Sequence, residues 1–451
     1  MVCVADDTYV LSSNPRNLQN LIDIIGHFGR RYRILFGADK TKVTITGSKI
    51  DMQYYQDINI WSLYGEKLVV SENNEHLGLL VSGIDEEIKN VDKNIKSARD
   101  TLFSLLGNIL SYKCKLSPTV QYHTWSVYVK PVLRSGLAAL PVRPTVLKAL
   151  TTFQLKILRA ILKLSKFSPI VPLYFLLGEL PVEATLHLDV LSLFWNIWVN
   201  PKTKAFEVLK YLLMMSKSNS LTWAAHVRIL FLKYNLPDPL VLLNSQPWTK
   251  ERWKEHSKAA VISHHEAALR NKAAGNYKLQ YLNVQVTGLT GRPHPIIARV
   301  LTTQDVTTMR PHIKMLTGDY QCFAYLAQDR GMEPHCRLCR LLLDAQDQAP
   351  AEDIEHLLTS CRATADTRSR IMPEILNALT TSFPSNRLLT NPNHIMLTQF
   401  LLDPCSMNLP NDIRLPPEHM NFTLITKLCC SLINALHKDR TRQLKAMGLL
   451  P

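Results

Sequence analysis

Four residues in the last third of the chain have the types and spacing of a zinc cluster. The pattern is Cys-x2-Cys-x16-His-x4-Cys, formed by Cys336, Cys339, His356 and Cys361. Thiolate sulfur and imidazole nitrogen suit tetrahedral Zn²⁺. Because protein would fill all four positions, no place remains for an activated water, and the pattern predicts a structural ion. Reduced cysteines beside an unrelated histidine are the alternative, and His335 and Cys322 are second choices as ligands.

Two adjacent carboxylates near residue 1 form a second candidate site. Asp6 and Asp7 stand between two β-favouring runs, residues 2–4 and 9–11, which predicts a strand, a tight turn and a returning strand. Neighbouring carboxylates repel each other unless a cation lies between them, and Mg²⁺ prefers oxygen ligands. The pair would suit a two-metal phosphoryl-transfer site. Asp-Asp is also a common turn dipeptide, so a solvated hairpin is the competing interpretation.

Helices must position most of these groups. Apolar residues recur on one face of residues 17–30, namely Leu18, Leu21, Ile22, Ile25 and Phe28. Residues 34–46 are strand-like. From residue 85 to 109, apolar spacings alternate between three and four, which predicts a long amphipathic helix. Its polar face carries Lys89, Lys93, Lys96 and Arg99. These cations could contact nucleic-acid phosphates or simply solvate the helix, and the spacing does not separate the two.

The composition favours a globular, intracellular protein with a polyanionic partner. The 451 residues are 46% hydrophobic and 20% charged, and the formal net charge is +15. Nucleic acid is favoured over an anionic membrane, although a basic protein without such a partner would have the same charge. The apolar region 170–199 contains prolines and acids, which predicts buried helices rather than a membrane span. Nine cysteines without an export signal favour a reducing compartment, nucleus or cytoplasm.

Three motifs, the first of which contains the aspartate pair, resemble those of reverse transcriptases and occur in the same order as in that family. Residues 5–8 (Ala-Asp-Asp-Thr) resemble the double-aspartate box, residues 36–43 the lysine-bearing palm motif with Lys40, and residues 75–82 the primer-grip motif with Leu77 and Gly78. Together with the cysteine-histidine cluster, they resemble polymerases of retrotransposons that lack long terminal repeats, the LINE type. The resemblance implies an RNA-directed DNA polymerase that extends a primer on RNA with deoxynucleoside triphosphates.

The resemblance also implies residue roles. Asp6 and Asp7 would hold Mg²⁺, Lys40 would assist at the phosphate end, and Leu77 with Gly78 would position the primer. The helix after residue 85 would be the thumb that grips the template-primer duplex, and Arg337 and Arg340 beside the zinc cluster would contact nucleic acid. In the family, fingers and a further metal-binding aspartate precede the double-aspartate box. Nothing precedes Met1 here, so the expectation is a truncated polymerase that is inactive alone.

The predicted fold is α+β and predominantly α-helical. It comprises a partial reverse-transcriptase palm (1–84), a helical thumb (85–200), a basic helical connector (201–315), a CCHC zinc-binding module (316–375) and a helical tail (376–451). In the connector, aromatic residues interleave with bases and favour stacking on RNA or single-stranded DNA; they are Trp248, Trp253, Tyr277 and Tyr281. Glycine and proline residues across 288–295 predict a linker.

Two other functions compete with the polymerase interpretation. The first is a non-enzymatic, zinc-dependent nucleic-acid-binding protein, and the second is an inert or structural helical protein. RNA and DNA are the expected partners, without a membrane, and Mg²⁺ and Zn²⁺ are the expected cofactors. The sequence carries no prediction of oligomeric state, template specificity or the role of the tail.

Overall fold

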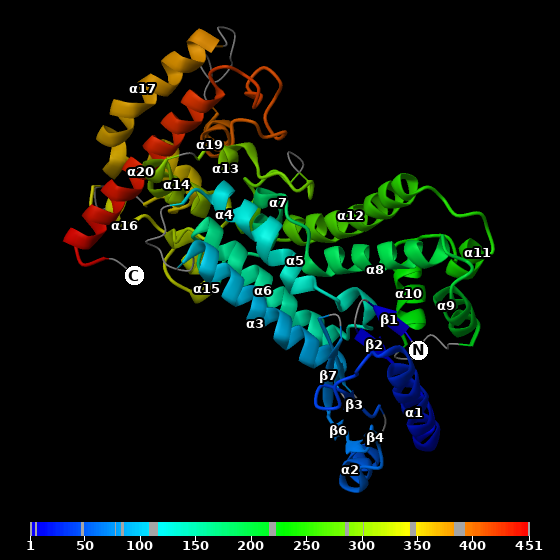
Figure 1. Ribbon diagram of the computed structural model, residues 1–451. Helices are drawn as coiled ribbons and strands as arrows, with labels where there is room; N and C mark the ends of the chain where they lie inside the picture. Colours follow the sequence, from blue (N-terminus) through cyan, green and yellow to red (C-terminus); the bar gives the residue numbers. More distant parts are fainter. Residues whose placement is uncertain are drawn as a thin grey trace. The chain divides into compact units, whose positions relative to one another are not determined.

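A computed structural model describes residues 2–4, 7–46, 49–76, 78–82, 85–107, 116–215, 222–284, 288–300, 302–342, 349–382 and 393–449. The chain divides into two compact units. The first comprises Met1–Ser97 and Leu133–Val146, and the second comprises Ala98–Val132 and Leu147–Pro451. Helices make up most of the described secondary structure, as the sequence predicts, and the strands are short (Figure 1).

The first unit combines short strand pairs with three helices. Its described elements are β1 (Val2–Val4), β2 (Asp7–Tyr9), α1 (Pro15–Tyr32), β3 (Lys42–Val43), α2 (Lys49–Ile58), β4 (Ser62–Leu63), β5 (Glu66–Lys67), β6 (Val69–Val70), β7 (Asn73–His76), β8 (Leu79–Ser82), the start of α3 (Glu86–Leu106) and η2 (Leu137–Ala139). The described strands pair as β1 with β2, β3 with β6, β4 with β5 and β7 with β8. Among these described pairs, β3 with β6 is the only parallel one.

Helix α1 shows how the sequence sets local structure in this unit. The Asn14 side chain accepts hydrogen bonds from the first turn, and Pro15 fits the first helical position, so the helix begins there. Ile22 joins a core with Trp61 and neighbouring strands. The predicted apolar face is only partly covered, because Phe28 is 50% exposed. Gly29 is buried instead, where a Cβ would overlap the backbone after the helix.

The described secondary structure of the second unit is helical apart from an isolated bridge between His335 and Ala351. Its elements are the rest of α3, α4 (Pro118–Thr124), η1 (Trp125–Val129), α5 (Lys130–Arg134), α6 (Pro144–Leu162), α7 (Val171–Leu177), α8 (Val182–Trp198), α9 (Lys204–Met215), α10 (Trp223–Lys233), α11 (Pro239–Leu243), α12 (Lys250–Ala274), η3 (Tyr277–Leu279), α13 (Pro295–Ala298), α14 (Thr303–Leu316), α15 (Phe323–Arg330), α16 (Arg337–Arg340), η4 (His356–Ser360), η5 (Arg362–Thr364), α17 (Ala365–Ser382), α19 (His394–Leu402) and α20 (Phe422–Ala446). Some elements cross the boundary between the units.

A buried carboxylate gathers the helices around α7. Glu179 is 1% exposed and accepts hydrogen bonds from Tyr122 (2.9 Å), Trp125 (3.1 Å) and Gln154 (3.0 Å). The ammonium group of Lys130 lies 3.0 Å from the same carboxylate. Donors from α4, η1, α5 and α6 therefore converge on one charge, and this full set of partners is what makes the buried carboxylate tolerable.

Two of the four aromatic residues predicted to stack on nucleic acid are core residues. Trp253 is 2% exposed, and its indole N–H donates to the Leu191 carbonyl. Tyr281 is also buried. Tyr277 is exposed, and Trp248 is half-buried with the guanidinium of Arg252 4.4 Å from its ring centroid. On α12 this pattern places Trp253 on the buried face, while the bases Lys250, Arg252 and Lys254 are exposed.

The predicted linker is packed against α7. The Gly291 amide donates to the Gly178 carbonyl at 2.7 Å, and the His294 amide donates to the Leu176 carbonyl at 2.8 Å. Gly178 has φ +61°, and a Cβ there would overlap the carbonyl oxygen of Arg292. The close approach of the two backbones therefore depends on Gly178, and the described part of the predicted linker is packed against α7.

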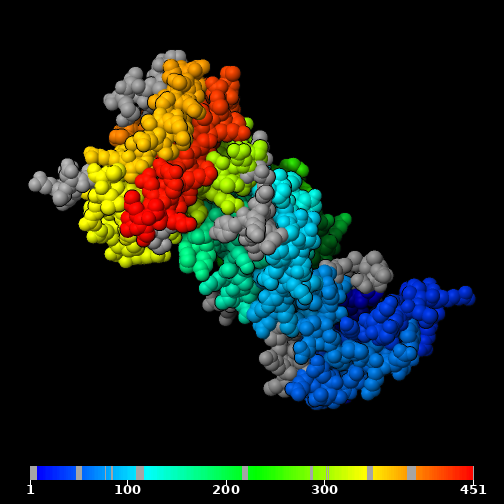
Figure 2. Space-filling view, turned by 90° about the vertical axis from the view of Figure 1, so that its left-hand side faces the viewer, coloured from blue at the N-terminus to red at the C-terminus, as the bar shows by residue number. Residues whose placement is uncertain are grey.

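The C-terminal helix α20 is a central element of its unit. It packs along both α14 and α17. Figures 1 and 2 show α17 and α20 side by side in orange and red. Apolar residues at helical spacing face this packing, among them Phe422, Ile425, Cys429 and Leu432, all fully buried. Within the described part of the chain, no helix is both long enough and apolar enough to span a membrane.

Two buried histidines flank one tyrosine between α8, α10 and α12. The Tyr234 hydroxyl lies 2.6 Å from His187 Nδ1 and 3.0 Å from His265 Nε2. Burial is the main cause that lowers the pKa of His187 to about 2 and that of His265 to about 4. Both rings are therefore neutral in the folded protein at every pH above these values.

Acid is expected to destabilise this unit through these two histidines. The unfolded chain takes up their protons near pH 6.5, whereas the folded chain does not, so stability is full above pH 6.5 and falls below it. Each ring contributes about 1.4 kcal/mol of loss per pH unit down to its folded pKa. Urea unfolding at pH 7 and pH 5 measures this. His187→Phe should reduce the difference, whereas His394→Gln, at an exposed position, should leave it unchanged.

Candidate metal centre

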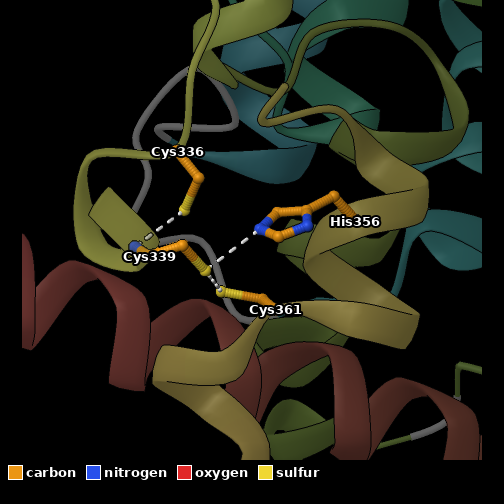
Figure 3. Close-up of side chains that lie close together, drawn as sticks. All are labelled: Cys336, Cys339, His356 and Cys361. Carbon is orange, nitrogen blue, oxygen red and sulfur yellow. Dashed lines mark hydrogen bonds between the residues drawn. The ribbon is translucent and has the colours of Figure 1, made fainter. Parts of the chain in front are cut away.

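The four predicted zinc ligands converge on one buried point (Figure 3). Cys336, Cys339, His356 and Cys361 are all buried, and their ligand atoms lie within 4.8 Å of one another. Cys339 Sγ is 3.4 Å from His356 Nε2 and 3.6 Å from Cys361 Sγ. Usual zinc bond lengths give tetrahedral edges of about 3.5 Å for sulfur to nitrogen and about 3.8 Å for sulfur to sulfur. The donors, their burial and their separations therefore fit a Zn²⁺ ion.

The first two ligands are presented by a short turn. Cys336 precedes α16, and its sulfur accepts the Cys339 amide N–H at 3.5 Å. The segment is held in place by two backbone hydrogen bonds, from Cys336 to Pro350 and from Glu352 to Pro334, each 2.8 Å. Because a two-residue spacer closes such a turn, both thiols point to the same side, as Figure 3 shows.

The other two ligands are brought together by a π turn. In an α-helix, residues five apart point about 140° away from each other. Here η4, His356–Ser360, is π-helical, and the Cys361 amide donates to the His356 carbonyl at 2.8 Å. This wider turn brings positions i and i+5 to one side. Helical residues begin at Ile354 and change to the π turn at the ligand.

Hydrogen bonds within the cluster already favour a thiolate. The bond from the Cys336 thiol, followed by contributions from His356, lowers the pKa of Cys361 to about 3. The same bond, with burial, raises the pKa of Cys336. Burial raises the pKa of Cys339 as well. A bound ion would have to displace the remaining thiol protons, so its affinity should fall in acid.

Arg368 supports the cluster from α17. Its guanidinium donates to the Leu358 carbonyl at 3.0 Å and to the Cys361 carbonyl at 2.8 Å. Leu358 lies within the π turn and Cys361 follows it, so Arg368 holds the turn and the residue after it. Its positive charge also lies near the Cys361 and Cys339 sulfurs, as their electrostatic effect on its pKa indicates. Such outer contacts orient metal ligands and tune their basicity.

Replacement of Arg368 by glutamine is expected to weaken zinc binding by about 10- to 100-fold, because the π turn loses its outer support. Competition with a chromophoric chelator measures the affinity. Arg370→Gln is the matched control, since Arg370 is exposed on the same helix. Equal affinities of the two variants would contradict the role assigned to Arg368.

The C-terminal helix closes the cluster from the other side. Leu444 of α20 belongs to the same buried core as Cys336, Cys339 and Cys361. The side chain of Gln443 donates to a carbonyl of the η5 turn at 2.8 Å. The sequence alone does not indicate a role for this tail. Apolar spacing predicts that it is helical, but the spacing does not show which surface it covers.

A buried ion pair also joins α20 to the zinc-cluster segment. Arg440 is paired with Glu352, whose side chain is fully buried. The Glu352 carboxylate also accepts the amide of Phe323, at the start of α15. Glu352 therefore connects α15, α20 and the strand-like segment that holds Cys336. The second-choice ligands are elsewhere: Cys322 caps α15, and His335 Nδ1 lies 2.7 Å from the Ala349 carbonyl.

The two arginines predicted to contact nucleic acid differ in their surroundings. The guanidinium of Arg337 is 4.4 Å from the ring centroid of Phe323 and is half-buried. Arg340 is 66% exposed and is paired at 3.0 Å with Glu333, which is equally exposed. Arg340 can therefore exchange its partner for a phosphate at little cost, since exposed ion pairs contribute little, whereas Arg337 also has a packing role.

A strand and a returning strand flank the aspartate pair, as predicted, but the returning strand is Asp7–Tyr9 rather than residues 9–11, so Asp7 begins β2 instead of lying in the turn. β1 and β2 are antiparallel, and Val4 is opposite Asp7. Asp6 lies outside the described residues, and so does the Asp7 side chain. Lys40 is exposed on a turn before β3. Gly78 has φ +81° at the tip of the β7–β8 hairpin, a conformation that favours glycine, and its neighbour Leu77 is outside the described residues.

Two of the four cations predicted on the thumb helix bind other side chains or the backbone of the same protein. Lys89 binds the side chains of Asn73 (2.7 Å) and Ser82 (2.8 Å). Lys93 donates to the Gly78 carbonyl at 2.9 Å and pairs with Glu75. These bonds fasten α3 to the β7–β8 hairpin.

The other two cations, Lys96 and Arg99, are exposed further along α3. The sequence places all four cations on one polar face, but it does not show that a hairpin covers the first part of that face.

Comparisons with known proteins add no relative. No protein-family model matches the chain, and no curated protein matches it. The family resemblance therefore rests on the motifs alone. The metal cluster does not depend on that resemblance, because its support is the spacing of the four ligands in the sequence and their convergence in the structure.

Proposed function

We propose that this chain carries the region from the palm to the zinc cluster of an RNA-directed DNA polymerase of the LINE type, and that its own contribution is to bind nucleic acid. In this proposal Asp6 and Asp7 hold Mg²⁺, Lys40 approaches the triphosphate, and Leu77 with Gly78 positions the primer. The zinc cluster holds the C-terminal part of the chain in the conformation that contacts the template.

The observation that carries the proposal is the closure of the Cys3His cluster. Its four ligands converge after three polymerase-like motifs in the same chain and in the order of the family. The β1–β2 hairpin around Asp7 and the β7–β8 hairpin around Gly78 also suit the roles that the resemblance gives these segments. The net charge of +15 favours a polyanionic partner.

Binding of a single-stranded RNA in a salt titration tests the nucleic-acid role. Replacement of the exposed Lys96 or Arg99 by alanine is expected to weaken binding and to lower the slope of log K against log salt by about 0.7 for each lost contact. Lys93→Met is the comparison variant, because Lys93 is held by the β7–β8 hairpin. It should change the slope much less. Equal slopes in all variants would remove α3 from the proposed interface.

Primer extension on an RNA template tests the catalytic part. The purified chain with Mg²⁺ and deoxynucleoside triphosphates is expected to bind template without extending the primer. Robust synthesis that disappears in Asp7→Asn would instead show that the chain polymerises alone. RNA binding should survive Asp7→Asn and weaken in Cys339→Ser, because the second substitution removes a zinc ligand.

A non-enzymatic nucleic-acid-binding protein is the second candidate. The observation that favours it is that the metal centre is the best-assembled candidate site among the described residues. This second candidate predicts the same RNA binding. It also predicts that substitutions in the polymerase-like motifs do not change function. Joining the chain to a fingers segment that carries the further aspartate separates the two, since only the polymerase proposal expects extension to appear.

A further inference from the structure

A second group of metal-ligating side chains lies outside the Cys3His cluster. His294 precedes α13, and Asp403 and Cys405 follow α19. Each is at most 3% exposed, and their ligand atoms all lie within 4.8 Å of one another. Neither the proposed catalytic site nor the proposed nucleic-acid interface uses these residues.

The separations suit a small ion. His294 Nε2 is 3.5 Å from one oxygen of Asp403, and Cys405 Sγ is 3.1 Å from the other. Zinc bonds of usual length give edges of about 3.3 Å between nitrogen and oxygen and about 3.5 Å between sulfur and oxygen. One nitrogen, one oxygen and one sulfur donor favour Zn²⁺ over Mg²⁺ or Ca²⁺, which prefer oxygen alone.

We propose that His294, Asp403 and Cys405 bind a second, structural zinc ion. The ion would join the N-terminus of α13 to the turn after α19, two segments more than 100 residues apart in the sequence. It would also neutralise the buried Asp403 carboxylate, whose neighbours in the structure are His294 Nε2 and the Cys405 thiol. Three protein ligands leave one tetrahedral position, which the second oxygen of Asp403 or a water fills.

A metal-free arrangement of the same atoms is the alternative that the experiment must separate. The Cys405 thiol donates to Asp403, and the Ile296 amide donates to His294 Nδ1 at 3.3 Å. That contact leaves the proton on Nε2, where it can donate to Asp403. Zinc binding releases the thiol proton, moves the imidazole proton from Nε2 to Nδ1 and ends the long contact with Ile296.

Zinc content of the purified full-length chain tests the proposal. Two zinc ions per chain are expected, one lost in Cys405→Ser and the other lost in Cys336→Ser. Cys430→Ser is the matched control and should retain both, because Cys430 contacts His312 and belongs to neither group. A single zinc that is lost in Cys336→Ser and kept in Cys405→Ser would overturn the second site while leaving the Cys3His site intact. Conversely, a single zinc lost only in Cys405→Ser would support the second site and reject the first.

Cobalt titration of the unsubstituted chain tests the same proposal and does not require that a substituted chain folds. Two equivalents of Co²⁺ should bind, and thiolate-to-cobalt absorption should rise strongly with the three-thiolate site and by about one third as much with the one-thiolate site. A titration that ends after one equivalent, with no second increase, would contradict the proposal.

Discussion

Replacement of Cys361 by serine, or removal of zinc with a chelator, is expected to unfold the segment around the Cys3His cluster and to release the end of α20. Leu444 and the three cysteines share one small core, so without the ion only weak sulfur hydrogen bonds join the four ligands. Structural zinc contributes about 10–16 kcal/mol in small zinc-finger peptides, and a fraction of that matches the stability of a whole domain.

Amide hydrogen exchange with and without chelator measures this effect. Protection should fall across residues 334–342 and 349–364 and in the last turns of α20, while α8 and α12 keep theirs because they pack elsewhere in the unit. Cys430→Ser should match the unsubstituted chain. Full protection of residues 440–446 in Cys361→Ser would show that α20 is held without the ion.

Replacement of Glu179 by glutamine is expected to destabilise the chain by about 3–5 kcal/mol, the usual cost of removing one partner from a buried charge pair. The variant leaves the ammonium of Lys130, whose side chain is 14% exposed, without its counter-ion. Its amide NH₂ also meets donors in either orientation, namely Trp125 and Gln154 at one oxygen position or Tyr122 and Lys130 at the other. Urea unfolding followed by circular dichroism gives the free energy.

Glu207→Gln is the matched control for this prediction. Glu207 pairs with Lys204 at 2.7 Å on the surface of α9, where both side chains are well exposed, so its loss should cost less than about 1 kcal/mol. If Glu179→Gln cost no more than Glu207→Gln, the buried carboxylate would not be the organising contact of α4 to α7. Lys130→Met combined with Glu179→Gln should recover part of the stability, because both charges are then absent and the amide oxygen still accepts a hydrogen bond.

The metal centre was predictable from the sequence because ligand spacing is a local property. Two residues between Cys336 and Cys339 fix a turn, whichever fold surrounds it. The π turn that brings His356 and Cys361 together was not predictable, since no residue pattern identifies such a turn in a sequence. Arg440 and Glu352 were not predictable as a pair either, because their contact joins segments 88 residues apart.

Surface chemistry was harder to predict than the helices. Lys89 and Lys96 have the same residue type and lie on the same predicted face, yet only Lys89 is held by the β7–β8 hairpin. Likewise Trp248 and Trp253 both stand among basic residues, but only Trp253 lies fully in the core. Periodicity identifies the buried stripe of a helix and says nothing of which neighbour covers the remainder.

The π turn at His356 has a consequence for how related clusters would be compared. A π turn carries about five residues through nearly the same rotation that an ordinary helical turn covers with about four. A cluster with three residues between histidine and cysteine on a regular helix would therefore present its donors as this chain does with four. A one-residue difference in that interval marks an insertion absorbed by the backbone, and it does not imply a change of coordination.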